Sequence, residues 1–374
     1  MKIKLYNKIA PTGLALLPAG WEKGEDLTGE DAILVRSADL HGTAFDENLK
    51  AIARAGAGVN NIPLDECTEK GIAVFNTPGA NAESVKELAL AAIFLTSRDV
   101  WGGMDWAKTL AGDPDAAKKV EKEKSRFQGP EVAGKTLGVI GLGAVGGKLA
   151  NAAVALGMTV LGYDPFLSVP GALALNGAVE LTPDLDRVFT ESDYISIHVP
   201  SLPATRGMLG GENLLKCKKG VRILNLARAD LAVDEDVLAG LAQGRIAAYF
   251  TDFPTPVLAG KPGVIATPHL GASTPEAEDH CAEMACRELK EFLTTGNAVH
   301  SVNFPNVTLA RGTGNRVAVL FRAEAAGAVA ALFAGARQAQ NTRGEVTYLI
   351  AETEKPLDEQ KIRAVPGVIR ANCF

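Results

Sequence analysis

The feature that most constrains this sequence is a glycine-rich turn, GLGAVG at 141–146, between a predicted strand and a predicted helix. The preceding strand is TLGVI at 136–140, the helix covers 148–156, and a second strand, TVLGY at 159–163, leads into Asp164. A dinucleotide-binding unit requires this strand–turn–helix–strand order, which a bare G-x-G-x-x-G motif lacks. The sequence therefore predicts an α/β fold with a doubly wound parallel sheet and a dinucleotide site.

Each residue of the turn has a physical task at such a site. Gly141 permits the tight turn, Gly143 lets the backbone approach a pyrophosphate, and Gly146 lets the helix pack close to the strand. The helix N-terminus favours an anion through its unpaired N–H groups and its dipole. Asp164 follows Gly141 by 23 residues, a spacing typical of an acid that binds ribose hydroxyls. Its charge repels a 2′-phosphate, so we expect NAD rather than NADP; a simple cap before Pro165 is the minority interpretation.

Composition narrows the class of protein. The 374 residues are 47% hydrophobic and 22% charged, which suits two to three globular domains. With a net charge of −6 and no basic block, no nucleic-acid partner is expected, and no apolar run reaches the ~18 residues of a membrane span. Five cysteines without CxxC spacing indicate free thiols and a cytoplasmic location. No metal is expected, because Glu276, His280 and Glu283 at helical spacing are interpreted as a solvated helix face.

Strand-like and helical patterns alternate through most of the chain, which favours parallel sheets. A charged segment at 104–130, bounded by Gly and Pro, separates a first α/β unit from a second one that begins near Lys135. From about Asn315 the pattern is strand, Ala-rich helix, strand, helix, strand. We therefore expect two doubly wound, Rossmann-like domains and a small C-terminal α+β domain.

Three strands downstream of the glycine turn end in basic or imidazole side chains. SDYISIHVP contains His198, RILNLAR ends in Arg228, and VIATPH ends in His269. Parallel strands end at one edge of a sheet, where ligands bind in doubly wound folds. A 2-oxo acid needs a planar donor fork, which Arg supplies, and a proton source that titrates near neutral pH, which is the usual task of His. Arg228 and His269 are the predicted catalytic residues, and His198 is interpreted as a wall of the site.

These stretches, together with RAGAGVNNIP at 54–63, VFNTPGANAESVKEL at 74–88 and TPHLGAST at 267–274, resemble the D-2-hydroxyacid dehydrogenase superfamily over nearly the whole chain. The resemblance is strongest to the branch that oxidises 3-phospho-D-glycerate to 3-phosphohydroxypyruvate for L-serine biosynthesis. It implies NAD as cofactor, a phosphorylated 2-hydroxy or 2-oxo acid as substrate, and a homodimer or homotetramer. The implied domains are a discontinuous substrate domain (1–103 and 286–311), an NAD-binding domain (104–285) and an ACT-like domain (312–374).

The resemblance also implies roles for individual residues. Arg228 would bind and polarise the 2-oxo acid, and His269 would donate the proton as hydride reaches the carbonyl carbon. The implied cofactor-binding residues are Gly141, Gly143, Ala144, Val145, Gly146, Asp164, His198, Val199, Pro200, Leu226, Ala227, Asp252 (near the nicotinamide carboxamide) and Gly271. The implied substrate-binding residues are Arg36 and Ser37 for the phosphate, the amides of Ala57 and Gly58 for the carboxylate, and Asn81 in the same pocket.

The sequence departs from the family pattern at two places. Pro256 or Val257 stands where the family has a carboxylate that keeps the catalytic His protonated, so we predict slow reduction or a more acidic pH optimum unless another acid such as Asp252 substitutes. RAEAAG at 322–327 lacks the polar loop with which ACT domains hold serine, so serine inhibition is not expected. Two alternatives stay open: another D-2-hydroxyacid dehydrogenase, and a non-catalytic NAD-sensing protein.

Overall fold

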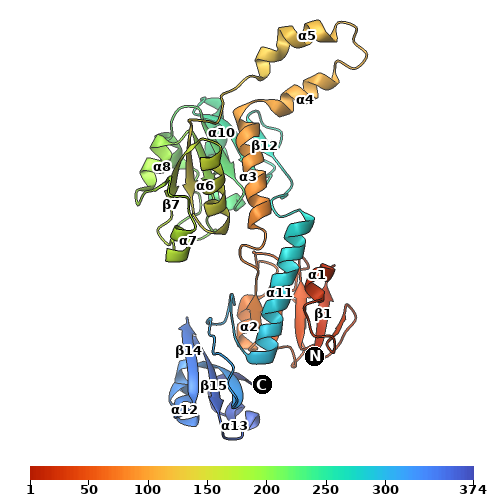
Figure 1. Ribbon diagram of the computed structural model, residues 1–374, viewed down its shortest axis with the longest axis vertical. Coiled ribbons are helices and arrows are strands. Elements are labelled where there is room, and N and C mark those ends of the chain that lie inside the picture. The colour runs from red at the N-terminus through yellow and green to blue at the C-terminus, as the bar shows by residue number, and fades with distance from the viewer. The chain divides into compact units, whose positions relative to one another are not determined.

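The computed structural model describes residues 1–374 and divides them into two compact units (Figure 1). Unit 1 comprises Met1–Asn81 and Thr274–Phe374, and unit 2 comprises Ala82–Ser273. The chain therefore changes units at 81/82 and 273/274, earlier than the limits of 103/104 and 285/286 expected from the sequence. The reason is packing: α3 (Ala82–Ser97) lies against α6 (Ala144–Ala155) of unit 2, whereas α11 (Pro275–Thr295) lies against the sheet of unit 1.

Unit 2 is built on a seven-stranded parallel sheet in the order β12-β11-β10-β9-β6-β7-β8. Its strands are β6 (Thr136–Ile140), β7 (Thr159–Tyr163), β8 (Val179–Leu181), β9 (Tyr194–Ile197), β10 (Val221–Asn225), β11 (Ile246–Thr251) and β12 (Val264–Ala266). Its shorter helices are α7 (Val169–Leu173), α8 (Leu185–Glu191), α9 (Gly211–Lys216) and α10 (Asp234–Ala242). Apolar side chains on the two faces of the sheet form two separate cores. The predicted doubly wound parallel sheet is confirmed, with its change of direction between β6 and β9.

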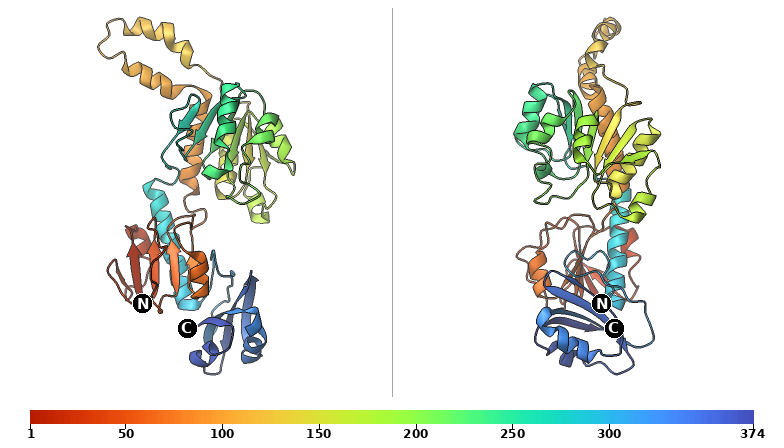
Figure 2. Two further views of the ribbon diagram at one scale, coloured as in Figure 1. Left: turned by 180° about the vertical axis from the view of Figure 1, so that it is seen from behind. Right: turned by 90° about the vertical axis from the view of Figure 1, so that its left-hand side faces the viewer.

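A helical hairpin leaves unit 2 between α3 and β6. It consists of α4 (Val100–Lys108) and α5 (Ala116–Glu123), and it extends away from the sheet (Figures 1 and 2). Its base is closed where Gly129 lies so near the Ser97 carbonyl that a Cβ would overlap it. No residue of α4 or α5 is buried, and Trp101 is 60% exposed. Two short helices with exposed apolar side chains lack the packing that usually stabilises such elements.

Unit 1 begins with a five-stranded parallel sheet in the order β2-β1-β3-β4-β5. Its strands are β1 (Lys2–Tyr6), β2 (Glu22–Gly24), β3 (Ala32–Val35), β4 (Ala51–Arg54) and β5 (Ala73–Phe75), and its short helices are α1 (Pro11–Leu14) and α2 (Leu64–Glu69). The long helix α11 starts at a Thr274 cap with Pro275 in its first position and ends at Gly296 in the left-handed region. Gly13 of α1 approaches Ala282 of α11 so closely that no Cβ would fit.

The C-terminal part of unit 1 is a four-stranded antiparallel sheet in the order β14-β15-β13-β16 (Figure 2). Its elements are β13 (Asn315–Arg322), α12 (Ala326–Leu332), β14 (Arg337–Arg343), β15 (Val346–Thr353), α13 (Glu359–Arg363) and β16 (Val368–Cys373). The single strand expected between the two helices is a hairpin, because the chain turns at Gly344 with φ +57°. One face of this sheet packs on α12 and α13, and the other joins the core of unit 1, where Tyr348 contacts Phe292 and Phe304.

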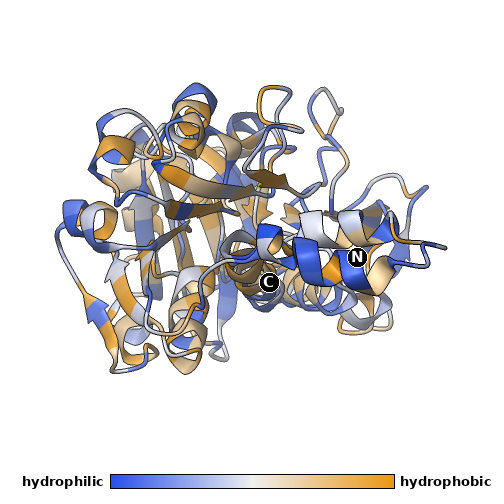
Figure 3. Ribbon diagram, turned by 90° about the horizontal axis from the view of Figure 1, so that it is seen from above, coloured by the Kyte–Doolittle hydropathy of each residue, from blue (hydrophilic) through white to orange (hydrophobic).

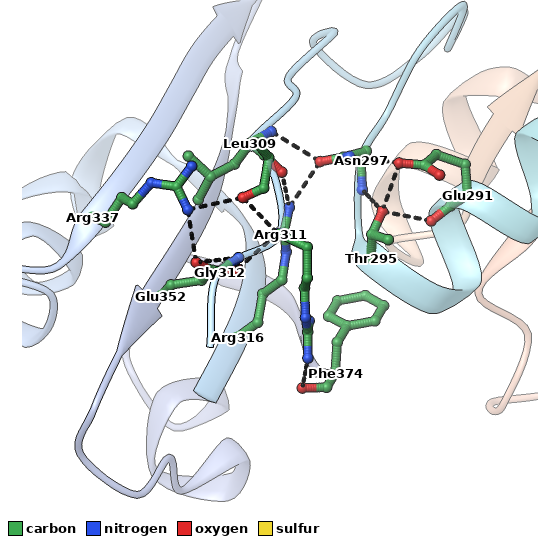
Figure 4. A network of polar contacts seen from close by, with 11 residues as sticks. Glu291, Thr295, Asn297, Leu309, Arg311, Gly312, Arg316, Arg337, Glu352 and Phe374 are labelled. Atoms are coloured by element: carbon green, nitrogen blue, oxygen red, sulfur yellow. Dashed lines mark hydrogen bonds and ion pairs between the residues drawn. The ribbon is translucent and has the colours of Figure 1, made fainter. Parts of the chain in front are cut away.

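A buried arginine joins the C-terminal sheet to the end of α11 (Figure 4). Arg316 of β13 is fully buried and donates to Glu352 of β15 at 2.9 Å, to Asn297 at 2.8 Å and to the Leu309 carbonyl at 2.6 Å. Glu352 also accepts a hydrogen bond from Arg337 at 3.0 Å. The bonds to Asn297 and Leu309 thus tie the C-terminal sheet to the linker that leads to it, and the two bonds to Glu352 join strands within the sheet.

Apolar residues are concentrated in the strands and in the helix faces that form the cores. Central strands are coloured as hydrophobic, and the helices show hydrophilic stretches (Figure 3). None of the helices combines the length and the apolar character that crossing a bilayer requires.

Candidate active site

The turns that follow the strands of unit 2 bring the predicted residues to one edge of its sheet. Because neighbouring strands are parallel, their carboxyl ends lie at the same edge. The residues at this edge are Gly141 after β6, Asp164 after β7, His198 after β9, Arg228 after β10, Asp252 after β11 and His269 after β12. Residues that lie between positions 141 and 269 of the sequence thereby form one series in the strand order of the sheet.

Two glycines of the turn, Gly141 and Gly146, pack tightly against backbone atoms, whereas the third, Gly143, faces open space. Gly141 has φ +90°, and a Cβ there would clash with the His198 carbonyl; a Cβ on Gly146 would overlap the Gly141 carbonyl. Gly143, by contrast, has no heavy atom within 4 Å of its Cβ position. Helix α6 starts directly after it, so the amides of Ala144 and Val145 are among those without an acceptor inside the helix. The arrangement fits a pyrophosphate in front of the turn.

Asp164 caps the turn before Pro165, as the minority interpretation of the sequence proposed. This capping does not prevent Asp164 from also binding ribose hydroxyls. One carboxylate oxygen accepts from the Leu142 amide at 2.9 Å, and the second accepts from the Phe166 amide at 2.9 Å. A carboxylate offers about four lone-pair sites, so acceptor capacity remains for ribose hydroxyls. Asp164 therefore holds the ends of β6 and β7 together at the place where the ribose is expected.

The backbone carbonyl of His198 packs against Gly141 of the glycine turn, and the His198 ring points toward Ser196 of β9. The imidazole Nε2 lies 2.8 Å from the hydroxyl of buried Ser196. Burial lowers the pKa of His198 to about 4, so its ring is neutral at physiological pH. The segment continues with Val199 and Pro200 at the same edge. His198 is thus a wall of this edge and not a proton source.

A residue that sequence reasoning missed, Asn225, shapes the turn that carries Arg228. Asn225 is fully buried, and its Oδ1 accepts from the amides of Ala227 at 3.2 Å and Arg228 at 3.4 Å. Its Nδ2 donates to the Arg228 carbonyl at 2.8 Å. The signal was present in ILNLAR, where Asn225 follows two apolar residues at the end of β10 and precedes Leu226.

Arg228 itself is exposed at the sheet edge. Its guanidinium forms no ion pair, and one nitrogen donates to the Ala227 carbonyl at 2.6 Å. The other donors of the planar fork are available to an anionic ligand.

Asp252 is buried and directed at the loop that carries His269. Its carboxylate accepts from the Thr267 hydroxyl at 2.7 Å, the Leu270 amide at 2.6 Å and the Gly271 amide at 2.7 Å. Its carbonyl also accepts from the His269 amide at 3.1 Å. The position near a nicotinamide carboxamide stays a prediction, and the observed role of Asp252 is to fix the 267–271 loop.

His269 lies exposed in this loop in an uncommon backbone conformation, with φ +53°. Its ring packs against Phe253 with the centroids 4.8 Å apart. No carboxylate of unit 2 pairs with the imidazole, and Asp252 is occupied by the loop. The structure thus supplies no substitute within unit 2 for the acid that is absent at Pro256.

The predicted substrate residues of unit 1 follow two adjacent strands. Arg36 and Ser37 come after β3, and the amides of Ser37 and Ala38 donate to the side chain of Asn7 at 3.0 and 2.7 Å. Asn7, a second residue that sequence reasoning missed, has φ +72° and ends β1. Its side chain fixes the backbone from which Arg36 extends.

The segment after β4 presents free amides. The N–H groups of Ala57 and Gly58 have no acceptor in the chain, and Asn76 holds the Ala57 carbonyl at 2.6 Å. Free amides of this kind are suited to a carboxylate. Asn81 lies at the end of the first segment of unit 1, directly before α3. No group of three or more His, Cys, Asp or Glu side chains is arranged to hold a metal ion.

Fold and site together define a doubly wound dinucleotide-binding protein with an arginine and a histidine at the carboxyl edge of its sheet. Residues 104–271 match the family model described as D-isomer specific 2-hydroxyacid dehydrogenase, NAD binding domain. Residues 104–271 of this chain are thus similar to the NAD-binding domain of the D-isomer specific 2-hydroxyacid dehydrogenases, and NAD is the cofactor of unit 2.

Individual relatives agree with this assignment. The chain is 35% identical over 320 residues to D-3-phosphoglycerate dehydrogenase of Methanocaldococcus jannaschii (82% of this chain, 58% of the relative). It is 34% identical over 294 residues to the human D-3-phosphoglycerate dehydrogenase (75% and 52%), and 37% identical over 298 residues to that of Mycobacterium tuberculosis (74% and 54%). The chain thus spans about half the length of the curated relatives it matches.

Solved structures show the same fold. A cofactor (NAD+)-bound 3-phosphoglycerate dehydrogenase from Entamoeba histolytica has a TM-score of 0.62 at 26% identity and covers 81% of this chain and 98% of its own. The D-mandelate dehydrogenase of Rhodotorula graminis has a TM-score of 0.69 at 23% identity and covers 82% and 99%, which is a likeness of fold alone.

Proposed function

We propose that this chain is an NAD-dependent dehydrogenase that interconverts 3-phospho-D-glycerate and 3-phosphohydroxypyruvate, the entry reaction of L-serine biosynthesis. The observation that carries the proposal is the common sheet edge in unit 2. Exposed Arg228 and exposed His269 follow β10 and β12 there, and the open glycine turn follows β6. The substrate class is supported by the names of the relatives.

The proposed roles follow from the donors that each residue offers. When bound, NAD accepts or supplies the hydride. Arg228 binds the carboxylate and polarises the carbonyl through its free N–H groups, and His269 gives or takes the proton at the carbonyl oxygen. The free amides of Ala57 and Gly58 bind the substrate carboxylate, and Arg36 and Ser37 bind the phosphate.

Two alternatives have a specific observation in their favour. The absence of an acid at Pro256, with no substitute in unit 2, favours a non-catalytic NAD-sensing protein. The pairing of Arg36 with Glu278 favours a dehydrogenase for a different 2-hydroxy acid. The exposed Arg228 and His269 weigh against the first of these.

The deciding experiment measures NADH oxidation by the purified protein with 3-phosphohydroxypyruvate, pyruvate and glyoxylate across pH. His269→Asn is the control. We expect turnover of the phosphorylated acid that is lost in the control, and an Arg36→Ala variant with a raised KM for that substrate only. Turnover of only the unphosphorylated acids would assign a sister dehydrogenase. NADH binding without any turnover would indicate the sensing protein.

The remaining proposals concern the C-terminal sheet and assembly. The strand–helix–strand–strand–helix–strand order of an antiparallel sheet with two helices on one face supports an ACT-like domain at 312–374. We infer the absence of serine inhibition from the segment 322–327 (RAEAAG), which lacks the polar loop with which ACT domains hold serine. A homodimer or homotetramer is supported by the α4–α5 hairpin, and a cytoplasmic location by five cysteines without a disulfide.

A further inference from the structure

The arginine proposed to bind the substrate phosphate already holds a carboxylate. Arg36 Nη2 lies 2.7 Å from Glu278 Oε1, and the two side chains are 42% and 44% exposed. The following inference rests on the proposed function and concerns the selectivity of the same site. Because both groups are within reach of solvent, an incoming anion can approach the guanidinium directly.

The backbones on both sides of the Arg36–Glu278 pair are fixed. On the strand side, Asn7 holds the amides after Arg36, and Arg54 Nε donates to the Arg36 carbonyl at 2.8 Å. On the helix side, Glu278 lies in the first turn of α11, which Thr274 caps. The pair can therefore open only by rotation of its side chains.

The first turns of α11 are tied to α1 as well. Thr12 donates to Asp279 at 2.9 Å, beside the close approach of Gly13 and Ala282. Asp279 is thus engaged, and Glu276, the other acid of the first turn, is exposed without an ion pair. Of these three acids, Glu278 alone neutralises Arg36.

A second guanidinium group, that of Arg54, lies near Arg36 and donates to its carbonyl oxygen. Cys281, one turn further along α11, lies within electrostatic range of Arg36 and Arg54 as well as Glu278. A phosphate dianion that approaches Arg36 meets a guanidinium group that already holds the Glu278 carboxylate. The carboxylate must leave Arg36 for the phosphate to bind, and it then remains nearby as a like charge.

We propose that Glu278 is a specificity-determining residue, an internal competitor for the anionic distal group of the substrate. A substrate with a distal phosphate binds only by displacing Glu278 from Arg36, whereas a 2-oxo acid without a distal anion leaves the pair intact. Exposed ion pairs contribute little free energy, so the exchange is accessible at equilibrium. The exchange raises the KM of the phosphorylated substrate and leaves kcat unchanged, because Arg36 and Glu278 act at the distal phosphate and not at the reacting carbonyl.

The test compares the wild-type protein with Glu278→Gln, and uses Glu276→Gln as a matched control that removes one charge from the same helical turn. For 3-phosphohydroxypyruvate we expect Glu278→Gln to lower KM about twofold to fivefold with an unchanged kcat, the size expected for one exposed charge pair. The KM for pyruvate should not change in either variant. Glu276→Gln should match the wild-type protein with both substrates.

A binding measurement keeps this inference separate from the proposed function. Isothermal calorimetry with inorganic phosphate on the full chain needs no turnover, so it applies even if no 2-oxo acid is reduced. We expect Glu278→Gln to bind phosphate about twofold to fivefold more tightly than the wild-type protein, and Arg36→Ala/Glu278→Gln to lose this gain. Equal or weaker phosphate binding by Glu278→Gln, or no binding by either protein, would overturn the inference. A total lack of turnover would overturn the proposed function alone.

Discussion

Asp252 accepts a hydrogen bond from the amide of Leu270, the residue directly after His269, at 2.6 Å. With the Gly271 amide and the Thr267 hydroxyl as further donors, the buried carboxylate holds both sides of the histidine loop. A catalytic group displaced by about 1 Å can lose about 100-fold in rate. We therefore expect Asp252→Asn to lower kcat by about 10- to 100-fold, because the amide nitrogen of Asn cannot accept from N–H donors.

Two measurements distinguish this positioning role from contact with the cofactor. NADH affinity, followed by fluorescence, should stay within about twofold in Asp252→Asn, since the predicted damage is to the loop. Thr267→Val removes one donor and leaves both amide bonds, so its loss in kcat should be much smaller. Weakened NADH binding with an unchanged kcat would place Asp252 at the nicotinamide instead.

The pH dependence of reduction should respond to an acid at position 256. His269 must carry a proton to reduce the carbonyl, and a carboxylate nearby favours the protonated imidazole. We expect Pro256→Glu to move the pH at which reduction falls to half its maximum upward by about one unit. Pro256→Ala, which removes the ring without adding charge, is the control. An unchanged profile in Pro256→Glu would show that this position does not act on His269.

The parts of the site that depend on contiguous sequence could be predicted. GLGAVG lies in a strand–turn–helix unit, and Arg228 and His269 follow strands, so residue order and the parallel sheet place them at one edge. Asn225 and Asn7 could not be assigned a role, because a side chain that holds a turn is recognised only from the direction of its amides. The sequence shows only an asparagine at or directly after the end of a strand.

Other features depend on distant or directional contacts. Arg36 and Glu278 are 242 positions apart, and nothing in either segment specifies the other. Asp252 was assigned to the cofactor from its motif, but the direction of its carboxylate follows from the conformation of the 267–271 loop. The division of the chain at 81/82 and 273/274 depends on the packing of α3 on α6 and of α11 on the sheet of unit 1, and no local pattern specifies these contacts.

The exposed hairpin predicts how copies of the chain associate. Trp101 and Met104 of α4 are 60% and 56% exposed, on helices with no buried residue. A second copy would bury these side chains, as a two-fold interface uses one patch twice. We expect light scattering to give a dimer or larger oligomer for the wild-type protein and monomers for Trp101→Lys/Met104→Lys. Lys118→Ala, at an exposed charged position of α5, is the control and should keep the wild-type mass. A wild-type monomer, or a double variant that still associates, would exclude this interface.

The Arg316–Glu352 pair predicts that the C-terminal sheet is a stable part of unit 1. Arg316→Met leaves Glu352 buried without its main partner, which typically costs about 3–5 kcal/mol. We expect hydrogen exchange of the β13 and β15 amides to accelerate accordingly. Arg337→Met, which removes a half-exposed partner of the same carboxylate, should cost about 1 kcal/mol or less. Recovery of protection in Arg316→Met/Glu352→Gln would confirm the buried charge as the cause, and equal effects of the two arginines would contradict it.

A buried carboxylate in α11 predicts a pH dependence of stability that does not involve the active site. Glu288 is 8% exposed; its Oε1 lies 2.7 Å from His300 Nδ1, and its Oε2 has no hydrogen-bond partner. Burial raises the pKa of Glu288 to about 8 from its ordinary value of 4.5. Between these two values the folded chain keeps a proton that the unfolded chain releases. Stability from this group is therefore complete below pH ~4.5 and is lost as the pH rises to about 8.

Glu288→Gln removes this titration and resembles the protonated side chain. We expect its melting temperature to equal that of the wild-type protein near pH 5 and to exceed it near pH 9 by on the order of 5 °C, since the penalty is a few kcal/mol at most. Glu276→Gln, an exposed acid of the same helix, should follow the wild-type protein at both pH values. A variant less stable than the wild-type protein at pH 9 would show instead that the charged Glu288–His300 pair stabilises unit 1.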